Sequence, residues 1–145
     1  MEGRCQCGHI RFITPLPRPL KIYFCHCTEC RHQSSSAHGV SAIFPSFEIP
    51  NPVPGSDITE QVGLYIRHTL RGCELQCLFC RRCGARLVHR VEGDEKLSVK
   101  GGCLVDLNED MMRHAEHIWC KEAVVEIPDR LADGTVVVKH DEEPV

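Results

Sequence analysis

The sequence lacks any apolar run that approaches the roughly 20 residues a membrane-spanning helix requires. Its opening stretch, MEGRCQCGHI, also lacks the apolar segment of a secretory signal peptide. These two absences argue against a membrane protein and against export. We therefore expect the protein in the cytosol or in another reducing compartment.

An excess of positive charge is lacking as well. The chain carries 17 Lys and Arg residues against 20 Asp and Glu, for a formal net charge of −3. Basic residues are scattered, and the nearest approach to a cluster is Arg81-Arg82. A surface that binds a polyanion needs concentrated positive charge, so we do not expect nucleic acid as a partner.

The length of 145 residues suits one domain with a modest core, and the sequence holds no internal repeat. We therefore expect a single domain over residues 1–145. Short segments rich in β-branched and aromatic residues predict that this domain is mainly β. The expected strands are 9–13, 21–25, 38–44, 64–71, 74–79, 85–90, 96–100, 117–127 and 135–138.

The segments between these strands predict turns and two short helices. Gly72-Cys73 is typical of a hairpin turn. A helix is expected over 28–38, with Thr28 available as its N-cap, and another over 107–115. The prolines and glycine of 50–57 predict a loop.

Cysteine is the residue type that stands out, with eleven in the chain. An odd number of cysteines without an export signal argues against a disulfide scaffold. In a reducing compartment such density favours metal binding or catalysis.

Two separated cysteine pairs predict a closed structural zinc site. In CRRCG, Cys80 and Cys83 form the knuckle of a zinc ribbon, in which the turn directs both thiolates at one point. A closed site needs four ligands, and Cys5 and Cys7 of CQC are the natural complement. Such a site would join distant parts of the chain and so stabilise a small core.

A third cysteine group, in FCHCTEC, supplies three thiols from one loop: Cys25, Cys27 and Cys30. Three thiolates can hold one zinc ion and leave its fourth tetrahedral position open, as catalytic zinc sites do. The alternative is a second closed site, completed by His26, Cys73 or Cys77.

Four motifs in order carry a resemblance to a known family. They are CxCG from Cys5, CHCxxCR from Cys25, FCxxCGxR from Phe79, and HIW from His117. Over about residues 3–127 the chain resembles the glutathione-dependent formaldehyde-activating enzymes, a family that includes the centromere-protein-V-like proteins. The resemblance implies two zinc ions per chain, a structural one on the four cysteines and a catalytic one on the three. It also implies a small domain of coiled antiparallel sheets, similar to methionine sulfoxide reductase B.

The resemblance implies carbon–sulfur bond chemistry, as a lyase or in adduct formation, with glutathione as the co-substrate. Where relatives carry a small serine-glycine turn and an aromatic residue, this chain has HQSSSAHG. That departure suggests a larger thiol-conjugated substrate, such as one from secondary metabolism. Side chains after the third cysteine are candidates for binding a glutathionyl group, unless they only solvate a surface helix: Arg31, His32, Gln33, Ser34 and His38.

Two other function classes stay open. One is a non-catalytic zinc-ribbon adaptor, and the other is a thiol redox enzyme that uses Cys103 or Cys120 free of metal. His117 is either a partner of the substrate or of a zinc-bound thiolate, or a structural residue. Trp119 is expected in the core. The sequence leaves the oligomeric state open.

Overall fold

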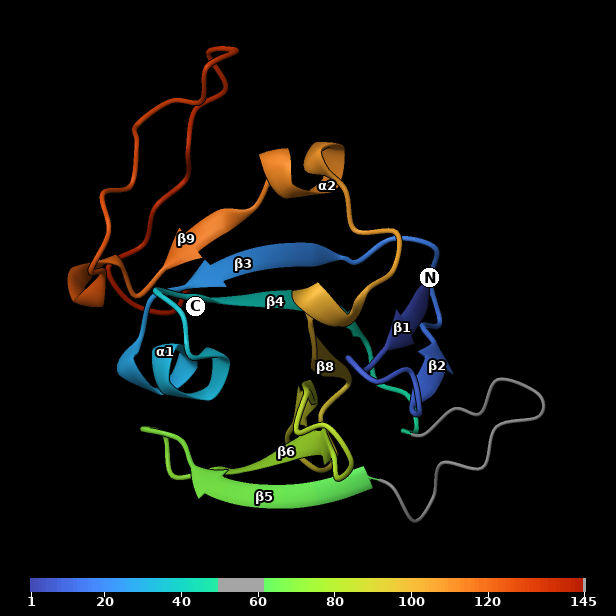
Figure 1. Cartoon of the computed structure of the whole chain (residues 1–145). Coiled ribbons are helices and arrows are strands. Elements are labelled where there is room, and N and C mark those ends of the chain that lie inside the picture. The colour runs from blue at the N-terminus through green and yellow to red at the C-terminus, as the bar shows by residue number, and fades with distance from the viewer. Residues whose placement is uncertain (50–61, 145) are drawn as a thin grey trace. The chain divides into compact units, whose positions relative to one another are not determined.

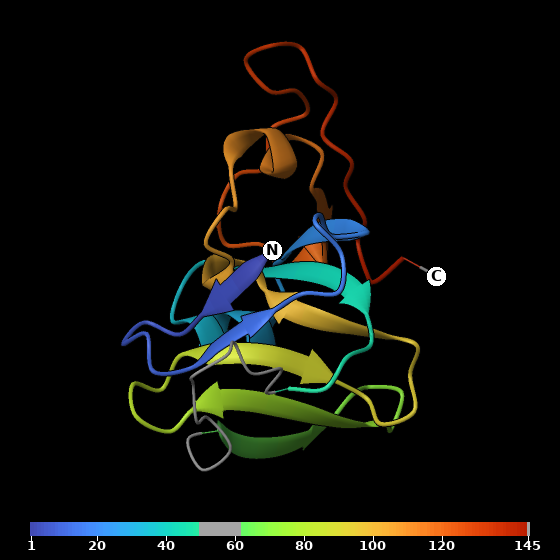
Figure 2. The same cartoon turned by 90° about the vertical axis from the view of Figure 1, so that its right-hand side faces the viewer.

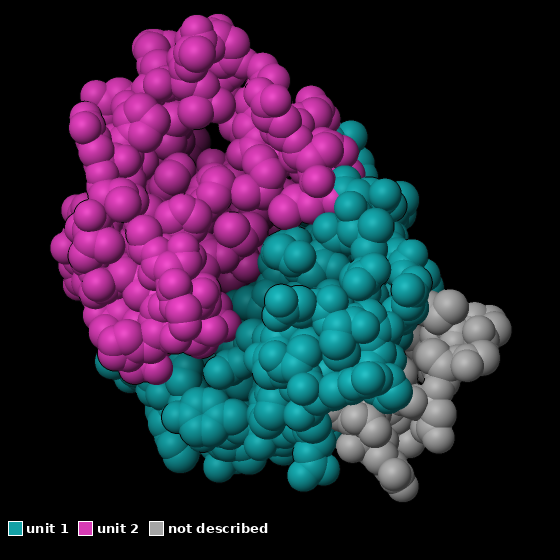
Figure 3. All heavy atoms as spheres, viewed as in Figure 1, with its two compact units in different colours: residues 1–20, 42–106 teal, residues 21–41, 107–145 magenta. Residues whose placement is uncertain are grey.

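The computed structural model describes residues 1–49 and 62–144, so the loop expected over 50–57 lies outside the described residues. The chain divides into two compact units, coloured separately in Figure 3. Unit 1 contains Met1–Leu20 and Ala42–Asp106, and unit 2 contains Lys21–Ser41 and Leu107–Val145. Among the described residues, no helix is long and apolar enough to cross a membrane.

Unit 1 is built from antiparallel strands. A two-stranded sheet pairs β1 (Glu2–Arg4) with β2 (Arg11–Ile13), and Figure 1 shows it beside the N-terminus. Four further strands follow one another in a second sheet and lie side by side in Figure 2. They are β5 (Val62–His68), β6 (Glu74–Cys80), β7 (Arg86–Arg90) and β8 (Lys96–Lys100). Next to β8 comes β4 (Gly39–Pro45), whose residues 42–45 belong to unit 1.

The apolar core of unit 1 is drawn from several of these strands. Its fully buried side chains include two phenylalanines, one from β2 and one from β4. Burial of such side chains is the main favourable term in folding. The largest fully buried apolar side chains are Phe12, Phe44, Ile10, Leu87, Val88 and Val99.

Gly63 in β5 is a point where the packing excludes a side chain. It lies directly opposite Phe79 of β6, and a Cβ atom built on it would come within 2.3 Å of the Phe79 ring. We expect Gly63→Ala to lower the free energy of unfolding by about 1–3 kcal/mol, the usual cost of overpacking. Urea denaturation measures this. Gly102→Ala is the matched control, because a Cβ there meets nothing within 4 Å, and equal losses in the two variants would contradict the prediction.

Unit 2 combines strands with two short helices. Its strand β3 (Lys21–Cys25) is hydrogen-bonded to β4 on one side and to β9 (Glu116–Ile118) on the other. Strands β3 and β9 run parallel. The helices are α1 (Thr28–Ser34) and α2 (Glu109–Arg113). Short 3₁₀ turns occur in both units, as η1 (Gly101–Cys103) in unit 1 and η2 (Cys120–Glu122) in unit 2. The C-terminal tail returns to β9 through an isolated bridge between His117 and Lys139.

The expected mainly β fold class is confirmed, and most expected strands are present within one or two residues. The parallel pair β3–β9 departs from the expected antiparallel pattern. The strand expected over 117–127 is wrong beyond Ile118, because Trp119 adopts a left-handed backbone with φ of 58° that ends the extended chain. The strand expected over 135–138 is also wrong, since this stretch makes a single isolated bridge, between Val136 and Arg130. Strand β1 was not expected.

Candidate functional site

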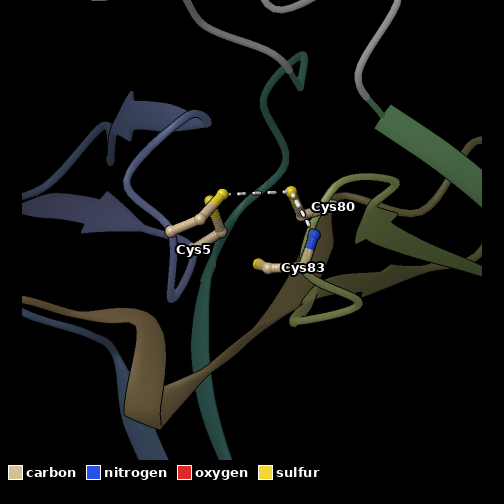
Figure 4. A group of neighbouring side chains, drawn as sticks. Cys5, Cys80 and Cys83 are labelled. Carbon is tan, nitrogen blue, oxygen red and sulfur yellow. Dashed lines mark hydrogen bonds between the residues drawn. The ribbon is translucent and has the colours of Figure 1, made fainter.

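The first cysteine group lies within unit 1, where two tight turns face each other (Figure 4). Cys5 and Cys7 lie in the turn between β1 and β2, whereas Cys80 is the last residue of β6 and Cys83 lies in the turn that follows it. Each turn closes at a glycine with positive φ, Gly8 at 74° and Gly84 at 79°. The amide of each glycine donates to the carbonyl of the first cysteine, as in a zinc knuckle.

The spacing of the four sulfur atoms fits a zinc ion. Their Sγ atoms all lie within 4.8 Å of one another, with 3.5 Å between Cys5 and Cys7 and 3.9 Å between Cys7 and Cys80. A tetrahedral site with bonds of about 2.3 Å needs sulfur separations of about 3.8 Å. All four cysteines are free, so none of these contacts is a disulfide. The predicted set of four ligands is therefore brought together as one donor group.

Backbone amides support the charge that such a group carries. The amide of Ile10 donates to the Cys5 sulfur at 3.2 Å, and that of Cys83 donates to the Cys80 sulfur at 3.4 Å. Burial raises the pKa of Cys80 to about 12. Burial also acts to raise the pKa of Cys83, but backbone hydrogen bonds from Cys7 and Ala85 outweigh it and lower that pKa to about 6. Donors aimed at sulfur suit thiolates bound to a cation.

The second cysteine group lies within unit 2, at the junction of β3 and α1. Cys25 is the last residue of β3, Cys27 is the N-cap of α1, and Cys30 is in the first turn of the helix. The sulfur of Cys27 accepts the amide of Cys30 at 3.3 Å and lies 3.5 Å from the sulfur of Cys25. The prediction of Thr28 as the N-cap is therefore wrong by one residue, because the Cys27 thiol caps the helix instead.

The three sulfur atoms also form a compact donor set, all within 4.8 Å of one another. Cys25 and Cys30 are buried, with Ile118, against the half-buried side chains of Tyr23, Cys27 and Trp119. Hydrogen bonds with the Cys27 and Cys30 thiols raise the pKa of Cys25, and burial raises it further. Three soft donors at this spacing suit a zinc ion, which would hold them as thiolates.

The three residues considered as a fourth ligand have other surroundings. The ring of His26 is hydrogen-bonded to His117, and Cys77 is buried, with its sulfur 3.7 Å from the carbonyl of Leu75. Cys73 is exposed in the turn between β5 and β6. Within residues 1–49 and 62–144, none of them joins the group of three sulfurs.

A stack of aromatic rings lies beside the second group, and the sequence did not predict it. His26 Nε2 and His117 Nδ1 are 2.9 Å apart, and His117 stacks on Phe24 with ring centroids 4.7 Å apart. His38 meets the edges of both Phe24 and His26. Burial, with some help from the neighbouring His26 ring, lowers the pKa of His117 to about 4, and burial also lowers the pKa of His26. Both rings are therefore neutral at pH 7. The hydrogen-bond partner of His117 in this structure is another protein side chain, His26.

The candidate glutathione-binding side chains are spread along α1 and the turn after it. Arg31 donates to Thr28 at 3.2 Å, and the Ser34 hydroxyl donates to the carbonyl of Cys30 at 2.7 Å. His32 is exposed, whereas Gln33 and His38 are half-buried. Ser34 therefore ties the end of the helix to its own backbone, whereas Arg31 is half-buried.

Cys103 and Cys120, the two cysteines considered for a redox role, lie outside both sulfur groups. Cys103 is buried, and its sulfur lies 3.0 Å from the carbonyl of Arg86. Burial raises the pKa of Cys103 to about 12, which leaves it a poor nucleophile. Cys120 is half-buried in η2. A metal-free redox thiol is therefore not favoured at Cys103.

Comparisons with known proteins agree with this geometry. Residues 1–122 match the sequence profile of the family described as glutathione-dependent formaldehyde-activating enzyme. The crystal structure of a protein from Rhodobacter sphaeroides is similar, with a TM-score of 0.57 and 21% identity. The similarity covers 81% of this chain and 99% of that one, and at this identity it concerns the fold. No curated protein matches the chain.

Proposed function

We propose that this chain, which belongs to the glutathione-dependent formaldehyde-activating enzyme family, is a zinc-dependent enzyme that makes or breaks a carbon–sulfur bond of glutathione or of a thiol conjugate. The observation that carries the proposal is the group of three sulfur donors from Cys25, Cys27 and Cys30. A zinc ion bound there would accept a soft sulfur ligand and keep that thiol deprotonated near neutral pH. The group of four, Cys5, Cys7, Cys80 and Cys83, would then hold a second zinc ion that stabilises the fold.

The chain holds the three donors in a fixed arrangement. Cys25 is anchored by the pairing of β3 with β9, and Cys27 by the amide of Cys30 at the start of α1. The start of α1, directly after Cys27, is fixed by Glu122, which accepts hydrogen bonds from the amide and hydroxyl of Thr28 at 2.8 and 3.0 Å. Fixed donors reduce the reorganisation that binding and reaction require.

The surroundings of the group suit a thiolate ligand. His26 and His117 are neutral rings, which add no positive charge that would compete with a metal for the sulfur atoms. Arg31 and His32 on α1 are the proposed contacts for the carboxylates of a glutathionyl group. The histidines of HQSSSAHG suit a conjugate larger than the formaldehyde adduct, such as an intermediate of secondary metabolism.

Zinc-edge X-ray absorption on the zinc-loaded protein tests this proposal. Added glutathione is expected to raise the mean number of sulfur neighbours per zinc, because an eighth cysteine-type sulfur joins the three-sulfur group while the four-sulfur group stays complete. The sulfur-free analogue γ-glutamyl-2-aminobutyryl-glycine is the control and is expected to leave the number unchanged. An unchanged sulfur number with glutathione, together with no calorimetric binding of glutathione, would favour the non-catalytic adaptor.

A further inference from the structure

The C-terminal tail returns to the strand that supports the three-sulfur group. Residues 123–145 lie beyond the match to the family profile, which ends at residue 122. In Figure 1 they leave η2 as a long loop (red) and come back beside β9. We call the returning segment, residues 138–142, the strap. The strap, β9 and the three sulfurs all belong to unit 2.

The strap pairs with β9 and with the start of η2 through main-chain hydrogen bonds. The amide of His117 donates to the carbonyl of Val138, and the amide of His140 donates to the carbonyl of His117, both at 2.8 Å. The amide of Cys120 then donates to the carbonyl of His140 at 3.0 Å. In this parallel pattern every second residue of the strap bonds to β9, so the amide of Asp141 faces away from it.

Side chains fasten the strap before and after β9 ends. His140 Nε2 lies 2.9 Å from a carboxylate oxygen of Glu116, and Glu142 forms an ion pair with Lys121. The ammonium of Lys121 lies 5.2 Å from the centre of the Trp119 ring, within the range of a cation–π contact. The carbonyl of Glu142 lies 3.5 Å from the amide of Trp119. The strap therefore contacts the main chain of Trp119 directly and its ring through Lys121.

Trp119 has a backbone conformation that a bulky residue avoids. Its φ of 58° and ψ of 39° are left-handed, and among the described residues other than glycine only Ser35 shares a positive φ. Such a conformation is unfavourable for a large side chain and persists only where the surrounding contacts enforce it. The strap supplies these contacts, because its hydrogen bonds fix the chain at His117 before Trp119 and at Cys120 after it.

The conformation of Trp119 decides where two parts of the three-sulfur site lie. Its side chain packs against Cys25 and Cys30. Its left-handed turn also begins η2, which carries Glu122, and the Glu122 carboxylate accepts the amide and the hydroxyl of Thr28. The strap thus acts on the side chain that covers two of the sulfurs and on the residue that fixes the start of α1.

We propose that the strap is a positioning element of the three-sulfur group: it keeps Trp119 left-handed and thereby keeps Cys25, Cys27 and Cys30 in the arrangement that binds zinc. This inference rests on the proposed function, which places a zinc ion at that group. When the strap opens, Trp119 relaxes and η2 no longer presents Glu122 to α1. The affinity of the group for zinc therefore depends on the far end of the chain.

Chelator competition on the zinc-loaded full-length protein tests the proposal with two variants at one position. His140→Ala and His140→Pro both remove the imidazole, but only proline also removes the amide that donates to His117. We expect His140→Pro to bind zinc at the three-sulfur group about tenfold more weakly than His140→Ala does, because a hydrogen bond and the contacts that depend on it are lost. The zinc that Cys27→Ser loses identifies this group in the titration.

Two controls separate the strap from general effects of proline. Asp141→Pro places proline at an amide that faces away from β9, where an extended chain tolerates the restriction on the preceding residue. It is expected to change the zinc affinity of the three-sulfur group less than about twofold. The four-sulfur group of unit 1 is the internal control and is expected to keep its affinity within about twofold in every variant.

Fluorescence reports the position of Trp119 directly, since the chain has one tryptophan. Its ring is half-buried against the sulfur group. In His140→Pro its emission is expected to shift to longer wavelength and to be quenched more strongly by acrylamide, because the released ring is more exposed to water. His140→Ala and Asp141→Pro are expected to keep the wild-type emission.

Hydrogen exchange on the unmodified, zinc-loaded protein keeps the test valid if His140→Pro does not fold. At urea concentrations below the unfolding transition, the amides of His140, Cys120 and Thr28 are expected to become exchangeable together, because opening of the strap releases all three. A Thr28 amide that stays protected where the His140 amide exchanges would show that the strap does not position α1.

Two results of the competition would also overturn the proposal. One is an equal zinc affinity of the three-sulfur group in His140→Pro and His140→Ala, and the other is an Asp141→Pro variant as weak as His140→Pro. A wild-type chain that holds a single zinc ion contradicts the proposed function instead. In that case the exchange of Thr28 still decides whether the strap positions the start of α1, so the two failures are read from different measurements.

Discussion

Cys83→Ser is expected to abolish the cooperative native fold at 37 °C. Cys83 lies in a group that joins the turn after β1 to the turn after β6, 73 residues apart between Cys7 and Cys80. Binding of structural zinc to four thiolates is worth about 10–16 kcal/mol in small zinc domains. That is as large as the whole stability of a typical domain, about 5–15 kcal/mol. Weakening the site therefore removes most of the margin that keeps unit 1 folded.

Circular dichroism melting and elemental zinc analysis measure this effect together. The matched control is Cys73→Ser, since Cys73 is an exposed cysteine in the hairpin turn of the same unit. The control is expected to keep the wild-type melting temperature and zinc content. A Cys83→Ser protein that melts within a few degrees of the wild type would show that the group of four is not the structural site.

Cys27→Ser is expected to keep the fold and to lower the rate of glutathione–formaldehyde adduct formation to that of the uncatalysed reaction. Serine is a preferred N-cap, so its hydroxyl replaces the sulfur that accepts the Cys30 amide. It is a poor ligand for zinc, however, so the three-sulfur group loses one of its donors. The variant thus separates the structural role of Cys27 from its proposed role in catalysis.

Proton NMR with ¹³C-labelled formaldehyde follows the adduct directly. Cys27→Ala is a second arm, expected to be equally inactive and less stable by about 1 kcal/mol through loss of the cap. Cys120→Ser, at a half-buried cysteine of the same unit, is the control and is expected to retain activity. Wild-type turnover in Cys27→Ser, or unfolding as complete as in Cys83→Ser, would refute the division between structural and catalytic groups.

Both cysteine groups could be predicted from the sequence because ligand spacing is a local property. CxxC and CxC fix two thiolates within one turn, and only the pairing of Cys5 and Cys7 with Cys80 and Cys83 required an argument about ligand number. Strands 21–25 and 96–100 were also predictable, the first from its β-branched and aromatic residues and the second from its alternation of apolar and polar residues.

The failures concern features set by tertiary contacts. The apolar run after Ile118 favours a strand, but the left-handed backbone at Trp119 turns the chain into η2. The N-cap of α1 is Cys27 and not Thr28, because the Cys27 sulfur, a member of the three-sulfur group, accepts the amide of Cys30. The placement of Arg86 depends on a one-residue bulge, and no local pattern in the sequence marks it.

The parallel pairing of β3 with β9 has a consequence for the order of events during synthesis. The two strands are joined by the amide of His26 and the carbonyl of Ile118, so the loop that carries Cys25, Cys27 and Cys30 emerges from the ribosome long before its supporting strand. At about 5–20 residues per second, the interval is several seconds. Throughout it the three thiols are held by local turns alone, exposed to whatever metal or oxidant the compartment supplies. The three thiols are therefore more open to oxidation in the nascent chain than in the finished protein, in which Cys25 and Cys30 are buried with Ile118.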